Sequence, residues 1–276
     1  MIYKCNLHTH TQFCDGKCSM EDMTKDAIDK GFVTLGFSPH SFTHFDTSYC
    51  LNDYNAFKQE FLRLKQKYKG QINLMRGIEF DAFGNMPDDE FDYVIGSVHY
   101  LAVKDKFLHV FDLQPNKVFA LDESKQTFDK LLKEGFGGDM IAVAQSYYDT
   151  VVDMVQKTKP TVIGHFDLVS LFGDFGKVKN EYEQIATNAV KKLAGCGCLV
   201  EVNANRKFKG KGGLYPADFL IKEFVAQGFD FVLSSDAHVT DSLGFDFDNT
   251  VDHLKSLGVT RLVSFDKNSN KIFIQI

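Results

Sequence analysis

Short apolar runs rich in branched residues alternate along this chain with longer stretches in which apolar residues recur every three or four positions. The short runs predict strands at Ile2–Leu7, Val33–Phe37, Ile72–Ile78, Tyr93–Val98, Thr161–Ile163, Leu199–Val202, Phe229–Leu233, Arg261–Ser264 and Lys271–Ile274. The longer stretches predict helices at Met20–Lys30, Asn52–Tyr68, Ser124–Glu134, Asp139–Lys157, Glu181–Ala194, Ala217–Ala226 and Thr250–Ser256. This alternation is typical of βα units built around a mostly parallel sheet.

Signals at the ends of the predicted helices support these boundaries. Ser19 followed by Asp22 resembles a capping box before the first helix, and Gly31 is a typical residue after its end. No internal repeat, low-complexity tract or linker interrupts the chain, so we expect one domain over residues 1–276. The stretch 100–138 has no clear strand of its own, and we expect it to be an insertion over one face of that domain.

Composition and charge narrow the class of protein. Of 276 residues, 44% are hydrophobic and 25% charged, which are globular proportions. The net charge of −6 repels nucleic acid on average, and one short basic segment, Lys207–Lys209, does not change that expectation. Six cysteines do not make a disulfide framework in a chain of this length. With no apolar leader in the first ten residues and no apolar run of membrane-spanning length, we expect a cytoplasmic protein without a membrane partner.

Nine histidine and acidic side chains follow six of the predicted strands: His8, His10, Asp15, His40, Glu79, His99, His165, Asp236 and His238. In a barrel of βα units those strand ends meet at one face, where active sites are built. Within the extended segment His8-Thr9-His10, residues two apart point the same way, and Asp236-Ala237-His238 repeats that spacing. A lone histidine at a strand end is more often structural than a ligand, but nine such groups together indicate a metal site.

Six imidazoles and three carboxylates suit Zn²⁺, Mn²⁺ or Fe²⁺ better than Mg²⁺. Nine ligands are too many for one ion, but three ions can share them if one carboxylate bridges. Such a cluster would carry a net charge of about +3 and would attract phosphate. A purely structural metal module is the alternative, but structural sites have closed ligand shells, whereas three ions sharing nine ligands leave open positions.

Six segments, taken together, resemble the polymerase and histidinol phosphatase (PHP) metallohydrolases: His8–Asp15, Ser38–His40, Gly77–Glu79, Gly96–His99, Ile163–Asp167 and Ser235–His238. The resemblance runs in order from Met1 to about Val251. Three further segments resemble the histidinol-phosphatase branch of that family: Tyr147-Tyr148, Glu201–Asn203 and Tyr215-Pro216.

The resemblance implies a distorted (β/α)7 TIM-like barrel with three divalent metal ions, Zn, Mn, Fe or a mixture, at the C-terminal ends of the strands. By matching motif, His8, His10, Glu79 and Asp236 would hold one ion; Glu79, His99 and His165 a second; Asp15, His40 and His238 a third. The implied reaction of this branch is hydrolysis of L-histidinol phosphate in histidine biosynthesis, by attack of a metal-bridging hydroxide on phosphorus. A PHP phosphoesterase that acts on nucleotides or nucleic-acid ends is the alternative.

Some residues outside the nine have weaker signals. Arg206 follows the strand Leu199–Val202 and is a candidate phosphate clamp, although it also fits a solvated basic loop. Asp236, His238 or water could protonate the leaving group, and these alternatives stay open. Cys14 and Cys18 flank Asp15 without a second cysteine pair to complete a metal site, so we expect free thiols. His44, four residues after His40, could touch substrate, but we expect a surface position for it, and structural or exposed roles for His109 and His253.

Overall fold

The computed structural model describes residues 3–103 and 118–276 of the chain. Its main sheet has nine strands in the order β1-β2-β3-β4-β7-β8-β9-β10-β11, and all neighbours are parallel except β10 and β11. The strands are β1 (Cys5–Asn6), β2 (Thr34–Phe37), β3 (Asn73–Asp81), β4 (Tyr93–Ser97), β7 (Val162–Ile163), β8 (Leu199–Asn203), β9 (Phe231–Ser234), β10 (Arg261–Phe265) and β11 (Lys271–Gln275). The mostly parallel α/β architecture is therefore confirmed.

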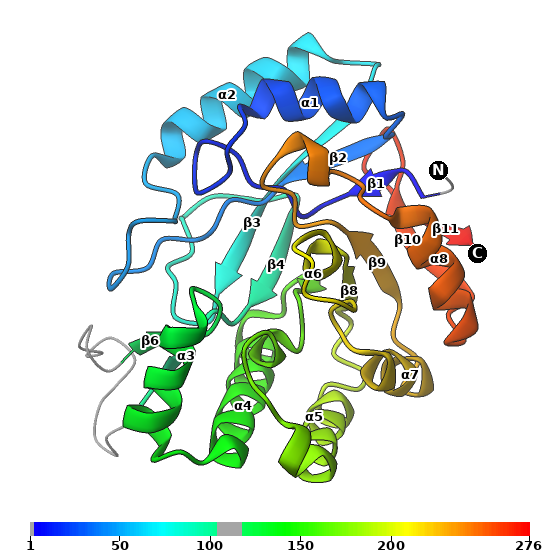
Figure 1. The fold of residues 1–276 in the computed structure, drawn as a ribbon. Helices are drawn as coiled ribbons and strands as arrows, with labels where there is room; N and C mark the ends of the chain where they lie inside the picture. The colour runs from blue at the N-terminus through cyan, green and yellow to red at the C-terminus, as the bar shows by residue number, and fades with distance from the viewer. Residues whose placement is uncertain (1–2, 104–117) are drawn as a thin grey trace.

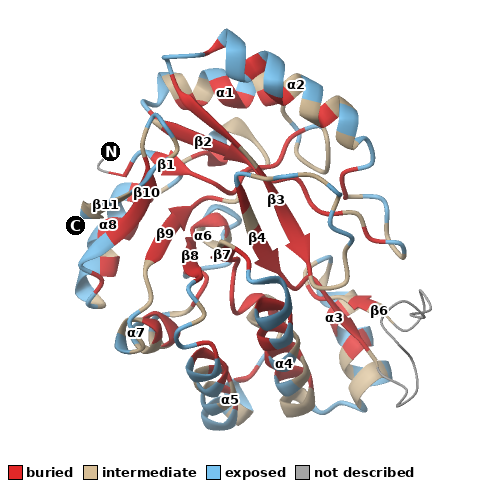
Figure 2. Cartoon of the chain, turned by 180° about the vertical axis from the view of Figure 1, so that it is seen from behind, coloured by how far each residue is buried: buried red, intermediate tan, exposed pale blue. Residues whose placement is uncertain are grey.

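Helices surround this sheet, with α1 and α2 along one side of it and α4, α5 and α7 along the other (Figure 1). The helices are α1 (Met20–Asp29), α2 (Tyr54–Lys67), α3 (Lys125–Lys130), α4 (Met140–Thr158), α5 (Lys179–Lys192), α6 (Asn205–Phe208), α7 (Asp218–Ala226) and α8 (Phe247–Ser256). The parallel strands of the main sheet are buried along almost their whole length, β11 is partly exposed, and most helices expose their outer face (Figure 2). Among the described residues no helix is long and apolar enough to cross a membrane.

The sheet curves back on itself but does not close. Within residues 3–103 and 118–276, a single bridge between Thr9 and Ala237 links the segments that follow β1 and β9, and no ladder joins these strands. At the opposite end of the strands, the Tyr3 hydroxyl donates to the Val263 carbonyl at 2.6 Å. The expected closed barrel is thus not confirmed, because side chains and one bridge, rather than a strand ladder, connect the two ends of the parallel sheet.

Tyr93 of β4 fills the concave side of the sheet below the candidate site. A Cβ atom at Gly36 would lie 2.2 Å from the Tyr93 hydroxyl oxygen, and one at Gly77 would lie 2.3 Å from its ring. The Tyr93 hydroxyl donates to the Leu7 carbonyl. Because only glycine fits beside this ring, the two neighbouring strands provide a closely packed base for the residues at their C-terminal ends.

The stretch 100–138 differs from its sequence prediction. Its described residues, 100–103 and 118–138, contain two short antiparallel strands, β5 (Tyr100–Ala102) and β6 (Val118–Ala120), where we expected no clear strand. Each has only three residues, which is too short for an alternating pattern to be recognised. His109 lies outside the described residues.

Candidate metal centre

The structure brings all nine predicted ligand residues together at the C-terminal ends of the parallel strands. Most of them lie in the loops that follow β1, β2, β4, β7 and β9. Glu79 is the exception, because β3 continues to Asp81 and Glu79 lies inside the strand rather than after it. Six of the nine are at most 7% exposed: His8, His10, His40, Glu79, His99 and His165. The side chain of Asp236 is 13% exposed.

Glu79 is at the middle of this cluster. One carboxylate oxygen, Oε2, lies 3.0 Å from His8 Nε2 and 2.9 Å from His40 Nδ1. The other, Oε1, lies 2.9 Å from His165 Nε2 and 3.2 Å from His99 Nε2. The two oxygens therefore face different sets of imidazoles, which is the arrangement of a carboxylate able to bridge two cations.

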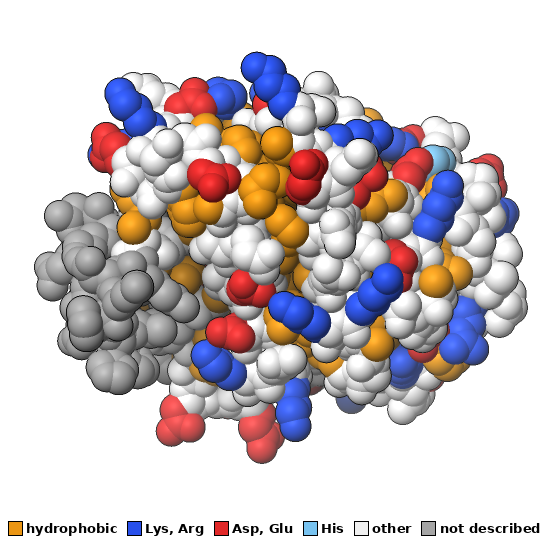
Figure 3. Space-filling view, turned by 90° about the horizontal axis from the view of Figure 1, so that it is seen from below, with side chains coloured by type: hydrophobic (Ala, Val, Ile, Leu, Met, Phe, Trp, Pro, Cys, Tyr) orange, Lys and Arg blue, Asp and Glu red, His pale blue; other side chains and the backbone are white. Residues whose placement is uncertain are grey.

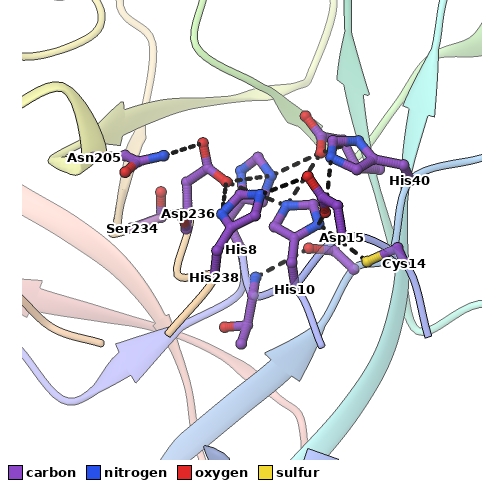
Figure 4. Close-up of polar contacts among 12 residues, drawn as sticks. His8, His10, Cys14, Asp15, His40, Asn205, Ser234, Asp236 and His238 are labelled. Atoms are coloured by element: carbon purple, nitrogen blue, oxygen red, sulfur yellow. Dashed lines mark hydrogen bonds and ion pairs between the residues drawn. The ribbon is translucent and has the colours of Figure 1, made fainter. Parts of the chain in front are cut away.

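Asp236 and Asp15 also face imidazoles of the cluster (Figure 4). Asp236 Oδ1 lies 3.2 Å from His10 Nε2, and Asp15 Oδ2 lies 3.2 Å from His238 Nε2. Potential ligand atoms lie within 4.8 Å of one another in four groups: His8, His10 and Asp236; His8, Glu79 and His165; His40, Glu79 and His99; and His10, Asp15, His40 and His238.

These groups have the chemistry that a divalent metal ion requires. Among the described residues, the buried atoms His8 Nε2, His10 Nε2, Glu79 Oε2 and Asp15 Oδ1 have no hydrogen-bond partner. Buried polar atoms without hydrogen bonds are costly, and here imidazole nitrogens and carboxylate oxygens point toward one another, as ligands of a shared metal ion would. Imidazole nitrogens and carboxylate oxygens suit Zn²⁺, Mn²⁺ or Fe²⁺, so the clusters could hold such ions.

Glu201 of β8 supports the cluster from below and was not predicted as a site residue. It is buried, and its Oε1 accepts hydrogen bonds from His8 Nδ1 at 2.6 Å and the Ser234 hydroxyl at 2.5 Å. Its Oε2 accepts from the His165 backbone N–H at 2.7 Å and the Asn203 amide at 3.1 Å. A carboxylate that binds Nδ1 leaves Nε2 of the same ring unprotonated and available to a metal ion.

Asp81 plays the corresponding part for His99. Its Oδ2 lies 3.2 Å from His99 Nδ1 and accepts a hydrogen bond from the His99 backbone N–H at 2.9 Å. Both supporting acids left a signal in the sequence: Asp81 stands two residues after Glu79 and so shares its face of β3, and Glu201 interrupts an apolar strand.

The electrostatics of the cluster are strongly coupled. Burial lowers the pKa of His8, but nearby carboxylates, first Glu79 and then Glu201, outweigh it and raise that pKa well above 6.5. Burial raises the pKa of Glu79, but the surrounding imidazoles, His8 foremost, hold it well below its ordinary range. Burial is likewise outweighed at Asp236, whose pKa lies well below its ordinary range beside His8. The carboxylates are therefore ionised and attract positive charge.

A cavity of about 330 Å³ opens above the cluster, lined in part by Asp15, His40, His99, His165, Asp236 and His238. Arg206 and Lys209 contribute positive charge to its lining, while Asp46, Asp122 and Glu123 contribute negative charge. Arg206 donates to the Ser170 hydroxyl at 2.8 Å, and its guanidinium lies 5.2 Å from the centre of the Tyr215 ring. Its Nε is buried without a hydrogen-bond partner among the described residues.

The remaining candidates lie where the sequence suggested. His44 contacts Asn85, and His253 pairs with Asp218 at an exposed position. Cys18 is a free thiol, and so is Cys14, whose sulfur lies 3.5 Å from His10 Nδ1.

The sequence of this chain is similar to a known family and to several named proteins. The sequence model of the PHP domain matches residues 6–205. A protein of Schizosaccharomyces pombe named "Probable histidinol-phosphatase" is 27% identical, over 94% of this chain and 89% of its own length. The "Histidinol-phosphatase" of Bacillus subtilis is 23% identical, over 90% of this chain and 98% of its own length.

A solved structure shares the fold. Histidinol phosphate phosphatase from Lactococcus lactis, complexed with zinc, L-histidinol and phosphate, superposes with a TM-score of 0.72. The superposition covers 97% of this chain and 98% of that one, at 20% sequence identity.

Proposed function

This chain belongs to the PHP domain family, and from that premise we propose that it hydrolyses L-histidinol phosphate to L-histidinol and phosphate in histidine biosynthesis. Relatives named for this activity match the chain over nine-tenths of its length or more. The Lactococcus lactis structure holds both products of the reaction together with zinc.

Our choice of this substrate rests on the opposite charges in the lining of the cavity. L-Histidinol phosphate has an anionic phosphate at one end and an ammonium and an imidazole at the other. Arg206 and Lys209 provide positive charge for the phosphate, while Asp122 and Glu123 provide negative charge for the cationic end. A nucleotide has no cationic end to place against those carboxylates.

We assign three divalent ions, Zn, Mn, Fe or a mixture, to the cluster, with the ligand sets that the family motifs indicate. His8, His10, Glu79 and Asp236 would hold one ion; Glu79, His99 and His165 a second; Asp15, His40 and His238 a third. The two-sided contacts of Glu79 support its bridging role. Ions bound there would supply Lewis acidity toward the phosphoryl oxygens and toward water.

The residues of the chain itself bind, orient and move protons. Arg206 would bind the phosphate with its planar guanidinium, held in place by Ser170 and Tyr215. Asp236 and His238 line the reacting end of the cavity and are our candidates for passing a proton to the leaving oxygen. The His238 Nδ1 contact with the Asp236 carbonyl at 2.9 Å fixes the orientation of that ring.

The same proposal extends to the fold and the setting of the reaction. We interpret β1–β4 and β7–β9 as the distorted (β/α)7 barrel of the family, in one domain, with the bridge between Thr9 and Ala237 at its seam. Residues from the stretch 100–138, among them Tyr100 and Asp122, line the cavity and support its placement over the active site. Six free cysteines fit the reducing cytoplasm.

A phosphoesterase acting on nucleotides or nucleic-acid ends is the competing function. It would need a basic surface to hold a polyanion. The face in Figure 3 instead intersperses lysine and arginine with aspartate and glutamate. Beside the cavity, Lys207 is paired with Asp246 at 2.7 Å, which reduces the positive charge of the one basic loop.

Phosphate release from L-histidinol phosphate by the purified chain, reconstituted with Mn²⁺ or Zn²⁺, tests the proposal. We expect turnover of about 1–10³ s⁻¹, abolished by a chelator. The same assay with a nucleoside monophosphate and with a phosphomonoester that lacks an amine should give much lower kcat/KM. Equal or greater activity on the nucleotide, with metal bound, would replace this substrate by the competing one.

A further inference from the structure

The loop between α5 and β8 brings two cysteine side chains together at the end of β8 opposite the metal centre. Cys196 and Cys198 are separated only by Gly197, whose φ of +82° turns the chain sharply. The Cys198 backbone N–H donates to the Cys196 sulfur at 3.4 Å. Cys196 is half-buried, whereas Cys198 is only 6% exposed. Cys196 is therefore the more accessible of these two neighbouring cysteines.

From this juxtaposition we infer that Cys196 is a site of reversible thiol modification, which reacts with low-molecular-weight disulfides such as glutathione disulfide, with Cys198 as the resolving thiol. Redox-sensitive cysteines typically combine an accessible thiolate with a neighbouring second thiol. The site is independent of the metal centre and of the proposed phosphatase activity.

The chemistry balances without any other reactant. The Cys196 thiolate attacks one sulfur of glutathione disulfide, forms a mixed disulfide and releases one glutathione thiolate. The Cys198 thiol then loses its proton and attacks the Cys196 sulfur, which forms the Cys196–Cys198 disulfide and releases the second glutathione. A disulfide across one intervening residue closes a small strained ring, so a reducing thiol should readily reopen it.

The surroundings of the two sulfurs favour this division of roles. Contact with the Cys198 thiol lowers the pKa of Cys196 from 9.0 to about 6. Burial opposes this shift, and the backbone N–H groups of Cys198 and Cys196 add to it. The same contact, together with burial, raises the pKa of Cys198. At neutral pH, Cys196 is then mostly thiolate and Cys198 remains protonated until it resolves the mixed disulfide.

The expected rate advantage is modest at pH 7 and larger in weak acid. At pH 7 a thiol of pKa about 6 has roughly 90-fold more thiolate than one of pKa about 9, but its lower nucleophilicity costs about 20-fold. The net advantage over an unfolded single-cysteine peptide is therefore about 4-fold at pH 7 and, by the same relation, about 20-fold at pH 6.

Mass spectrometry of the folded chain after exposure to glutathione disulfide tests the inference. In the unaltered chain, two thiols should be lost without a retained adduct. In Cys198→Ser, one glutathione should remain on Cys196, and in Cys196→Ser neither product should form. Cys18→Ser, which alters a half-buried thiol elsewhere, is the matched control and should react as the unaltered chain does.

Three results would overturn the inference. Cys196 could react no faster than the unfolded peptide at pH 6, which would remove its reactivity. A mixed disulfide could persist in the unaltered chain, which would remove Cys198 as the resolving thiol. Modification could continue unchanged in Cys196→Ser, which would place the reactive thiol elsewhere. Phosphatase activity enters none of these readouts, so its loss would not affect the result.

Discussion

Replacing Glu201 by Gln keeps the shape of a buried side chain but changes what it can accept. The Glu201 carboxylate accepts four hydrogen bonds, two at each oxygen, from His8, Ser234, His165 and Asn203. A glutamine amide offers one acceptor oxygen and one N–H₂ group. Whichever way the amide is turned, its N–H₂ group faces two donors, so the replacement cannot satisfy all four contacts.

Each orientation has a predictable cost. If the N–H₂ group faces His8, that ring must carry its proton on Nε2, the atom that faces Glu79 and Asp236 and is needed for a metal ion. Losing such an orienting partner typically lowers metal affinity 10–100-fold, or about 1.4–2.7 kcal/mol. If the N–H₂ group faces the His165 backbone instead, an unpaired buried donor costs about 1–3 kcal/mol of stability.

Two measurements distinguish these outcomes. Competition with a chelator gives the affinity for Zn²⁺ or Mn²⁺, and thermal unfolding of the metal-free chain gives the stability. Ser234→Ala is the matched control, because it removes one donor but keeps the carboxylate against His8. It should cost about 1 kcal/mol of stability and leave metal affinity near that of the unaltered chain. Unchanged affinity and unchanged unfolding in Glu201→Gln would refute the orienting role.

Four further predictions follow from the same contacts. Arg206→Ala should raise KM for L-histidinol phosphate about 10–100-fold in steady-state kinetics, because a charge-assisted contact contributes about 1.5–3 kcal/mol. Asp122→Asn should lower kcat/KM for this substrate about 10-fold and leave that for a phosphomonoester without an amine unchanged. The melting temperature of the metal-free chain should fall as pH rises above 6.5. The pKa of His8 is higher in the folded chain than in the unfolded chain, so protonation of His8 stabilises the fold. This stabilisation is complete below pH 6.5 and is lost as the pH rises through the folded-state pKa. Metal-loaded protein should lack this fall, because metal ions bind the neutral ring. Gly77→Ala should cost about 1–3 kcal/mol in urea unfolding, since its Cβ would overlap Tyr93.

The strands and helices could be predicted because their signals are local. Each of the nine predicted strands has a counterpart in the main sheet, and α6 is the one described α-helix without a predicted counterpart. It has only four residues, fewer than a hydrophobic repeat needs. The predicted closure of the sheet rested on family resemblance alone. Contacts between the two ends of the sheet, such as that of Tyr3 with Val263, join residues 260 positions apart, so local sequence patterns do not reveal them.

The nine candidate ligands could be found because the ends of parallel strands converge, so position along the strand already predicts proximity. Glu201 escaped that reasoning because it lies in the middle of β8, at a position normally occupied by an apolar side chain. Asp81 escaped it although it ends β3, because the expected strand already ended at Ile78 with Glu79 as its ligand. Their role depends on which ring nitrogen they face, and no spacing in the sequence specifies that. The opposite charges on the cavity lining were also unpredictable, since Asp122 and Arg206 lie far apart along the chain.

These two acids also change how phosphate must be held. With three divalent ions and three carboxylate ligands, the sequence predicted a centre with a net charge of about +3. Glu201 and Asp81 are buried against His8 and His99, and counting them lowers that charge to about +1. A centre of that charge attracts a phosphate dianion far less strongly. Binding should therefore depend on Arg206, a cation in the cavity lining, more than the ligand set alone implies.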